Sequence, residues 1–180
     1  MFMISGGPGA GKTTLLAELQ KLGYSTVPEV ARQIIQEQVR SGGAALPWAD
    51  KEAYTRLMLR RSIESYIEHA SLPGPIFFDR GILDTLCYAR LIGLADASDI
   101  HDACRNYGYA PLVFLAPPWE EIYITDNERK QEFAHAVQTF QSMAEVYEEY
   151  GYASVMLPKT SPAARAKFVL QTIPRAGHVL

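Results

Sequence analysis

The stretch FMISGGPGAGKTTLLAEL, residues 2–19, decides the fold of this 180-residue chain. A short apolar run is followed by a turn in which Gly6, Gly11, Lys12 and Thr13 have the spacing G-x-x-x-x-G-K-T, and then by a helical pattern. Glycines let the backbone bend tightly and approach a ligand, and free N–H groups at the start of a helix attract phosphate. The stretch therefore predicts a strand, a loop and a helix that together bind nucleotide phosphates.

Each part of this loop has a predicted role. Lys12 is expected to reach the β- and γ-phosphates, and the hydroxyl of Thr13 to hold a magnesium ion, so the predicted cofactors are ATP and Mg²⁺. The predicted nucleotide-binding residues are Gly6, Gly7, Pro8, Gly9, Ala10, Gly11, Lys12, Thr13 and Thr14.

Length and composition limit the classes of protein to consider. A chain of 180 residues fits one domain, residues 1–180, and a net charge of −3 argues against a general nucleic-acid binder. No apolar run approaches the roughly 20 residues that span a bilayer. The early start of the loop leaves no room for a signal peptide, and Cys87 and Cys104 are expected to be reduced. We therefore expect a cytoplasmic protein without membrane or nucleic-acid partners; its oligomeric state is not indicated.

Apolar strand-like runs alternate with helical patterns along the whole chain. This alternation predicts an α/β protein of the P-loop NTPase fold, with a five-stranded, mostly parallel sheet and helices on both faces. The helix predicted at 48–70 is expected to turn Leu59, Ile63, Ile67 and Ala70 to the core. Strands are expected at 2–5, 25–27, 76–78, 112–116 and 154–157. The other helices are expected at 12–21, 29–39, 82–92, 98–106, 129–150 and 162–172.

The third predicted strand ends in FFDRG, residues 77–81. Asp79 is expected to bind the magnesium ion together with Thr13, and Arg80 to offer its planar donors to phosphate oxygens as a catalytic cation. A GTPase would carry an N-K-x-D segment, and many ATPases would end this strand in Asp-Glu; neither is present. The alternative for Asp79 and Arg80 is an ordinary ion pair in a turn.

The stretch VPEVARQII, residues 27–35, follows the second predicted strand. Glu29 and Arg32 are three residues apart, hence on one face of a first helical turn at the rim where α/β sheets bind ligands. Glu29 is predicted to be the catalytic base for an acceptor hydroxyl and Arg32 to hold the substrate. The alternative for Glu29 is an exposed glutamate favoured by the helix dipole.

The stretch PPWEEIYITDNERKQEF, residues 117–133, is polar and precedes a long helix. It is predicted to form a closing lid, residues 119–131, because phosphoryl transfer must exclude water. Arg129 is the catalytic cation expected in this lid. A solvated helix N-terminus is the alternative.

The segments GGPGAGKTT, PEVAR, FFDRGILDTLCYAR, FLAPPW and DNERKQEF, in this order, resemble the small P-loop kinases that carry an AAA-type ATPase domain. They are also similar to the kinase domain of bacterial nicotinamide riboside kinases and, more distantly, to thymidylate and deoxynucleoside kinases. The resemblance implies that Glu29, Arg32 and Asp84 belong to the acceptor site and Asp79 and Arg80 to the catalytic centre. It also implies that Arg129 is the lid arginine and that residues 158–161 line the base pocket.

These patterns predict an ATP- and magnesium-dependent kinase of a small, hydroxyl-bearing, nucleoside-like metabolite. Two alternatives stay open. The first is an ATPase or nucleotide-dependent switch that presents the helix at 48–70 to a protein partner. The second is a nucleoside monophosphate kinase, in which Arg56, Arg60 and Arg61 would bind the acceptor phosphate, although a solvated helix face also explains these arginines.

Overall fold

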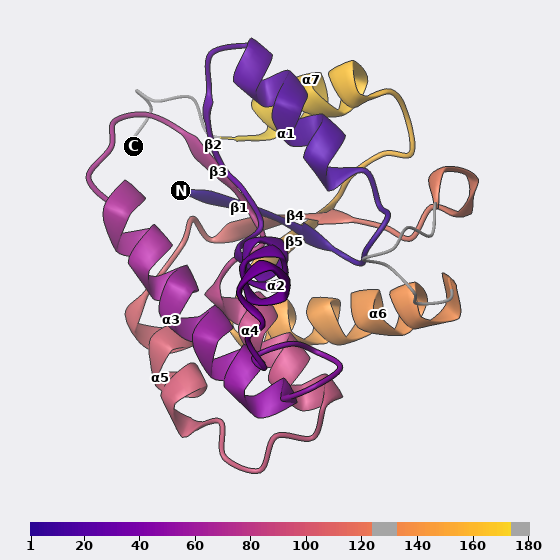
Figure 1. The fold of residues 1–180 in the computed structure, drawn as a ribbon. Coiled ribbons are helices and arrows are strands. Elements are labelled where there is room, and N and C mark those ends of the chain that lie inside the picture. Colours follow the sequence, from indigo (N-terminus) through magenta and orange to yellow (C-terminus); the bar gives the residue numbers. More distant parts are fainter. Residues whose placement is uncertain (124–132, 174–180) are drawn as a thin grey trace.

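The computed structural model describes residues 1–123 and 133–173 of the chain (Figure 1). The strands are β1 (Phe2–Gly6), β2 (Ser25–Val27), β3 (Ile76–Asp79), β4 (Leu112–Ala116) and β5 (Ala153–Met156). The helices are α1 (Lys12–Lys21), α2 (Val30–Ser41), α3 (Lys51–His69), α4 (Ile82–Leu91), α5 (Ser98–Asn106), α6 (Phe133–Glu149) and α7 (Pro162–Thr172), and a 3₁₀ turn, η1, covers Glu120–Ile122. The predicted elements are all found; residues 129–132 of the helix predicted at 129–150 lie outside the described residues. In the two described ranges, no helix combines the length and the apolar character needed to cross a membrane.

The five strands form one sheet with the order β2-β3-β1-β4-β5, and every pairing is parallel. The mostly parallel sheet that the sequence predicts is thus parallel throughout. Ile4 of β1 lies opposite Asp79 of β3 on one side and Phe114 of β4 on the other. Parallel strands end at the same edge of a sheet, so the residues that follow β1, β2 and β3 are brought together there.

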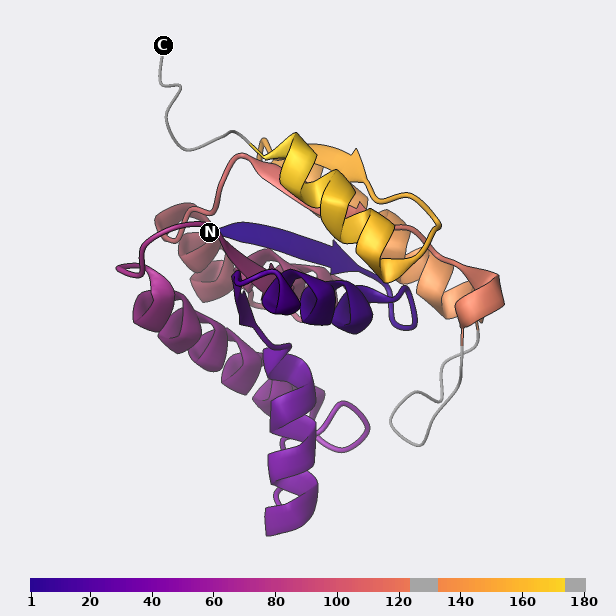
Figure 2. The same cartoon turned by 90° about the horizontal axis from the view of Figure 1, so that it is seen from above.

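Helices cover both faces of the sheet (Figures 1 and 2). Neighbouring residues of one strand point to opposite faces. Met3 and Phe78 accordingly belong to the core under α3, α4, α5 and α6, whereas Ile4 and Phe77 belong to the core under α1 and α7. This double burial explains why the strands are nearly continuous apolar runs.

Helix α3 differs from the sequence-based expectation. Leu59 is buried, but Ile67 is 58% exposed and Ala70 lies at the exposed end of the helix. The buried face instead carries Tyr54, Thr55, Met58, Leu59 and Ser62. Polar side chains on this face break the apolar pattern from which the stripe was predicted, because part of the face lines a pocket instead of the core.

Helix α2 extends away from the sheet (Figure 2). It packs on α3 through Ile34, which contacts Tyr54 and Met58 in a small separate core. The helix ends at Gly42, whose φ of 69° is in the left-handed region that glycine adopts readily. Helix α2 begins directly after β2, so its N-terminus, with Glu29, lies at the edge of the sheet beside the ends of β2 and β3.

Candidate active site

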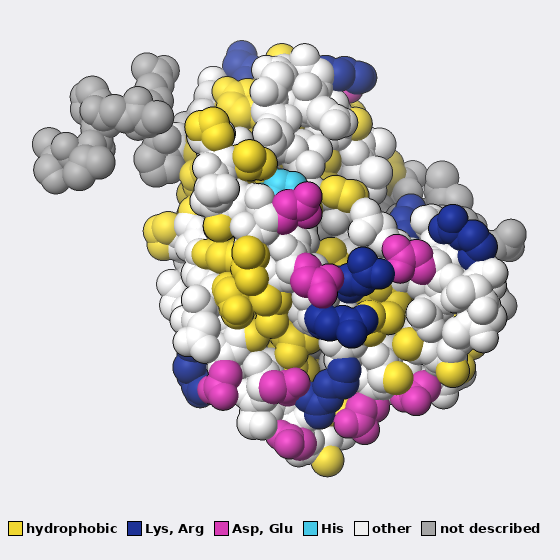
Figure 3. Space-filling view, turned by 60° about the vertical axis from the view of Figure 1, so that its left-hand side comes forward, with side chains coloured by type: hydrophobic (Ala, Val, Ile, Leu, Met, Phe, Trp, Pro, Cys, Tyr) yellow, Lys and Arg dark blue, Asp and Glu magenta, His cyan; other side chains and the backbone are white. Residues whose placement is uncertain are grey.

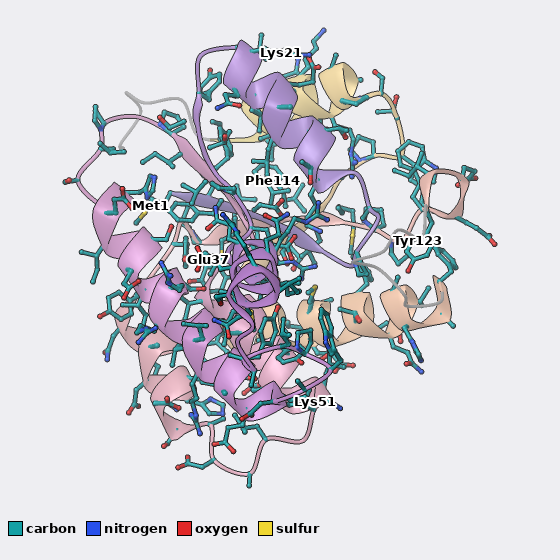
Figure 4. The ribbon with its side chains drawn as sticks, in the orientation of Figure 1. Met1, Lys21, Glu37, Lys51, Phe114 and Tyr123 are labelled. Atoms are coloured by element: carbon teal, nitrogen blue, oxygen red, sulfur yellow. The ribbon has the colours of Figure 1, made fainter. Side chains whose placement is uncertain are left out.

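The loop between β1 and α1 has no room for side chains at its glycines. A Cβ atom on Gly6, whose φ is 134°, would lie 2.4 Å from the carbonyl oxygen of Ala116. On Gly9 it would lie 2.5 Å from the ring of Tyr123, which lies next to the loop (Figure 4). The tight course of the backbone, followed directly by the N-terminus of α1, is the arrangement that binds phosphate through N–H groups.

Lys12 turns its ammonium group back into this loop. Its Nζ donates to the carbonyl oxygens of Gly6 and Gly7, at 3.0 Å each, and the residue is 6% exposed. Burial, followed by the charge of Arg80, lowers the pKa of Lys12 to about 8. The loop therefore already contains a cation whose charge is poorly compensated, and an anion is the ligand that would compensate it.

Arg165 of α7 supports the loop from outside. It is 2% exposed, and its Nη1 donates to the carbonyl oxygens of Ala10 (2.9 Å) and Gly11 (3.4 Å). Its guanidinium also lies over the ring of Trp119, 5.9 Å from the centroid. These carbonyls belong to the peptides that carry the N–H groups of Gly11 and Lys12, so holding them from outside directs those N–H groups to the other side. Arg165 thereby stabilises the loop in the conformation that binds an anion.

Asp79 and Arg80 lie at the end of β3 beside this loop. Asp79 is 6% exposed and its Oδ1 has no hydrogen-bond partner among the described residues. Burial raises the pKa of Asp79 to about 6, although Lys12 opposes the shift. Arg80 has a φ of 70°, an unusual value for a residue with a side chain. A buried carboxylate oxygen without a hydrogen-bond partner, next to a residue with positive φ, is typical of a ligand site.

Arg80 joins two carboxylates. Its Nε lies 2.9 Å from Glu29 Oε1, and its Nη1 lies 3.5 Å from Asp84 Oδ1. These carboxylates, together with Asp79, raise the pKa of Arg80 above its usual range although burial opposes the shift. Arg80 is therefore charged at every accessible pH and holds Glu29 next to the end of β3.

Asp84 is fully engaged by its neighbours. Its Oδ1 accepts a hydrogen bond from Ser5 Oγ, and its Oδ2 accepts from Tyr147 Oη and from the N–H of Gly81, at 2.7 Å each. The residue is 5% exposed. Asp84 thus connects the start of α4 to β1 and α6. Because Asp84 also contacts Arg80, these hydrogen bonds help to fix the position of Arg80.

A pocket lies between the end of β3 and helices α2 and α3. The charged residues that line it are Glu29, Asp79, Arg80 and Asp84, and apolar lining comes from residues such as Phe78. Glu29 is the N-cap of α2, yet its carboxylate makes no capping hydrogen bond and instead pairs with Arg80. The half-buried Arg32 is not among the lining residues.

The structure thus gathers some predicted site residues and separates others. Lys12, Glu29, Asp79, Arg80 and Asp84 interact electrostatically with one another at the edge of the sheet. Thr13 and Thr14 are exposed on the first turn of α1, where the Thr14 hydroxyl donates to Gly11 O at 2.9 Å. Arg129 and residues 124–131 of the predicted lid lie outside the described residues.

Sequence reasoning missed three contributors to this site. They are Arg165, Tyr147 and Thr85, which the sequence pattern places in helices without indicating a role. The signal for Arg165 and Tyr147 was their position on the apolar faces of α7 and α6, where a polar side chain needs a buried partner. Thr85 carries no such signal, because threonine is common in helices.

The fold and the loop together define a P-loop protein of the kinase type of architecture. The model of the family described as AAA domain matches residues 1–165, and the chain belongs to that family. No curated protein matches the sequence.

Several solved structures with the same fold are kinases. Thymidylate kinase from Ehrlichia chaffeensis has a TM-score of 0.63 at 16% identity, covering 95% of this chain and 97% of that one. Deoxyadenosine kinase from M. mycoides has a TM-score of 0.59 at 18% identity, with coverage of 95% and 97%. Shikimate kinase from Acinetobacter baumannii has a TM-score of 0.55 at 17% identity, with coverage of 94% and 90%. At these identities the similarity establishes the fold, and the resemblance to nicotinamide riboside kinases stays a prediction.

Proposed function

We propose that the chain is one P-loop kinase domain that transfers the γ-phosphoryl group of ATP to a hydroxyl group of a small, nucleoside-like metabolite. The observation that carries this proposal is the pairing of a phosphate-type loop with a carboxylate-lined pocket at the neighbouring strand end. A protein that only binds or hydrolyses a nucleotide has no need of such a second pocket. The names of the fold neighbours, which are kinases of small molecules, support the same reading.

The described residues fit a magnesium ion that is bound mainly through phosphates. No group of three or more metal-binding side chains occurs in the part of the chain that the structure describes. Mg²⁺ usually takes one or two protein ligands besides phosphate oxygens and water. The unpartnered Asp79 Oδ1 suits one such ligand and the exposed Thr13 hydroxyl another. The ion would neutralise charge that develops on the phosphates.

In the proposed reaction the acceptor oxygen forms a bond to the γ-phosphorus while the bond to the β–γ bridging oxygen breaks. The acceptor proton passes to Glu29, and ADP leaves. Lys12 and the loop N–H groups hold the phosphates, and Arg80 orients Glu29 and stabilises negative charge on the transferred group. We propose that the lid at 119–131, with Arg129, excludes water from this reaction. Arg32 would lie at the outer side of the acceptor.

The two cysteines bear on the compartment of the protein. Cys87 and Cys104 are both free and buried, which fits a reducing compartment, and we assign the protein to the cytoplasm on that ground. The alternative function is a nucleotide-dependent switch. A switch needs no group that accepts a proton from an acceptor, so this alternative predicts that ATP turnover does not depend on Glu29.

Glu29→Gln tests the proposal directly. We expect phosphoryl transfer to fall by about 10²- to 10⁴-fold, at the lower end if the transition state is dissociative, because the base is lost. ATP affinity should change far less than transfer, because the ion pair of Glu29 is with Arg80 in the acceptor pocket and its effect on Lys12 of the loop is only electrostatic. The measurement is transfer to a panel of nucleosides, cofactor precursors and sugars, alongside ATP hydrolysis without acceptor.

Two variants control this experiment. Glu37→Gln makes the same chemical change on the exposed side of α2, where Glu37 pairs with Arg61, and should leave transfer unchanged. Lys12→Ala should abolish both transfer and hydrolysis. Equal, small losses of transfer and hydrolysis in Glu29→Gln, or no transfer to any acceptor, would favour the switch.

A further inference from the structure

We infer that the acceptor of this kinase carries no anionic group and that the hydroxyl of Thr85 recognises one of its polar groups. The inference rests on the proposed phosphotransfer and adds to it the charge class of the substrate and a specificity-determining residue. Three independent features of the pocket support it.

The first feature is the charge of the pocket. Three carboxylates line it, Glu29, Asp79 and Asp84, and the one cation among the described lining residues is Arg80. Arg80 is already paired with Glu29 at 2.9 Å and with Asp84 at 3.5 Å. With Asp79 assigned to the magnesium ion, Glu29 and Asp84 still outnumber the single cation Arg80, so an acceptor phosphate or carboxylate at close range would be repelled.

The second feature is the position of the three arginines of α3 that a nucleoside monophosphate kinase would use to bind the acceptor phosphate. Arg56 pairs with Glu52 and Asp99, and Arg61 pairs with Glu37 at 3.0 Å. Arg60 lies 4.0 Å from Glu64, and none of the three lines the pocket. In the view of Figure 3, basic and acidic side chains lie next to each other, as expected for surface ion pairs. This arrangement argues against a nucleoside monophosphate as acceptor.

The third feature is the unusual state of Thr85. The residue lines the pocket, is 0% exposed, and its Oγ1 has no hydrogen-bond partner among the described residues. Two other threonines inside helices donate to the carbonyl four residues earlier: Thr55 to Lys51 at 2.7 Å, and Thr172 to Phe168 at 2.8 Å. A buried hydroxyl without a partner costs free energy, and a ligand that supplies the partner recovers it.

The size and lining of the pocket agree with a small neutral group. Its free volume of about 20 Å³ accommodates one water-sized group, such as a hydroxyl of the acceptor. Val27, Met58, Phe78 and Tyr109 supply apolar walls around it. Such a mixture of apolar walls and a few polar atoms selects ligands by the placement of single hydrogen bonds.

The charge class is tested by the transfer assay with matched pairs of acceptors. Each nucleoside is compared with its 5′-monophosphate, and neutral polyols are compared with shikimate. We expect kcat/KM to be at least tenfold higher for the neutral member of each pair. Transfer to the monophosphates or to shikimate in preference to neutral acceptors would overturn the inference and leave the kinase intact. Absence of transfer to every acceptor would contradict the proposed function itself.

The role of Thr85 is tested by Thr85→Val, which keeps the shape and removes the hydroxyl. We expect the KM of the best neutral acceptor to rise about 3- to 10-fold, the value of one ordinary hydrogen bond, with the KM of ATP unchanged. Thermal stability should not fall, because the hydroxyl has no partner to lose. Thr85→Ser should keep the acceptor KM within about twofold.

The matched control is Thr55→Val, the same substitution at another buried helical threonine, whose hydroxyl is bonded. This variant should lose stability and keep the acceptor KM. Loss of stability without a change of KM in Thr85→Val would show that the hydroxyl has only a structural role and would refute the assignment.

Discussion

At the scale of single residues, Asp79 is the place where stability and the proposed chemistry conflict. Its carboxylate is buried, and Oδ1 has no partner in the described structure. Burial raises its pKa from 3.8 to about 6. Because the folded state holds a proton that the unfolded state has already released, stability falls as the pH rises from about 4 to 6. Above that window the cost of the buried charge is present in full.

Asp79→Asn should therefore make the protein without ligands more stable and less active. The gain in the free energy of unfolding should be absent near pH 4, grow up to pH 6 and then stay constant, at about 3 kcal/mol or less. Turnover should fall by about two orders of magnitude or more, because a carboxylate next to the metal is lost. Denaturant unfolding at several pH values, with steady-state turnover at pH 7.5, measures both.

Asp102→Asn provides the control, because Asp102 is exposed on α5 and pairs with Arg105. It should change neither the pH dependence of stability between 4 and 6 nor the turnover. If Asp79→Asn is less stable than the wild type at pH 7, the carboxylate is compensated in the folded state and the conflict does not exist.

At the scale of elements, the start of α4 is held by a side-chain network that spans β1 and α6. Ser5 and Tyr147 both donate to Asp84, which in turn contacts Arg80. Tyr147 is 0% exposed. The position of Arg80 relative to the phosphate loop is therefore determined by how α4 and α6 pack against the sheet.

Tyr147→Phe removes one donor from Asp84 and leaves a buried carboxylate oxygen with one hydrogen bond fewer. We expect a loss of about 1–3 kcal/mol in the free energy of unfolding. We also expect a fall in kcat of about tenfold with little change in the KM of ATP, because Arg80 is less firmly held. Tyr150→Phe, at the end of the same helix, loses a contact with His101 and should leave kcat unchanged. Equal kcat values in the two variants would show that the hydrogen bond from Tyr147 to Asp84 does not contribute to the reaction.

At the scale of the whole molecule, the phosphate loop is held between elements that are distant in the sequence. Arg165 of α7 contacts the loop from one side, and Tyr123, after β4, lies against Gly9. Helices α1 and α7 also share one core, which includes Leu15, Ala166 and Val169. Helix α7 is therefore part of the proposed nucleotide site, although Arg165 is 154 residues from Gly11.

Arg165→Met should reduce stabilisation by the magnesium–nucleotide complex. For the wild type, a ligand at 100 times its Kd stabilises by about 2.7 kcal/mol. A tenfold weaker affinity would halve this gain to about 1.4 kcal/mol. Lys167→Met, on the exposed side of α7, serves as the control and should keep the full gain. The measurement is the melting temperature with and without ligand. The same gain in both variants would mean that Arg165 does not support phosphate binding.

The local pattern alone was enough to predict the phosphate loop, the strands and the alternation of elements. Glycine spacing and apolar runs act through the backbone and through burial, and both depend on residues that are close in the sequence. The order of the strands placed Glu29 and Asp79 at one edge, as expected from parallel strands that end together. The loop and the strands required no knowledge of long-range packing, whereas the strand order was not predicted and is known only from the structure.

The pairing of side chains was decided by the tertiary structure. The partners of Asp84 are Ser5 and Tyr147, which are 79 and 63 residues away, and the loop carbonyls bind Arg165. The apolar stripe predicted on α3 was wrong at Ile67, which is exposed, and part of the buried face of this helix lines a pocket instead of the core. Residue type and periodicity cannot specify which distant side chain meets a buried polar group, since that choice depends on how helices and sheet pack in three dimensions.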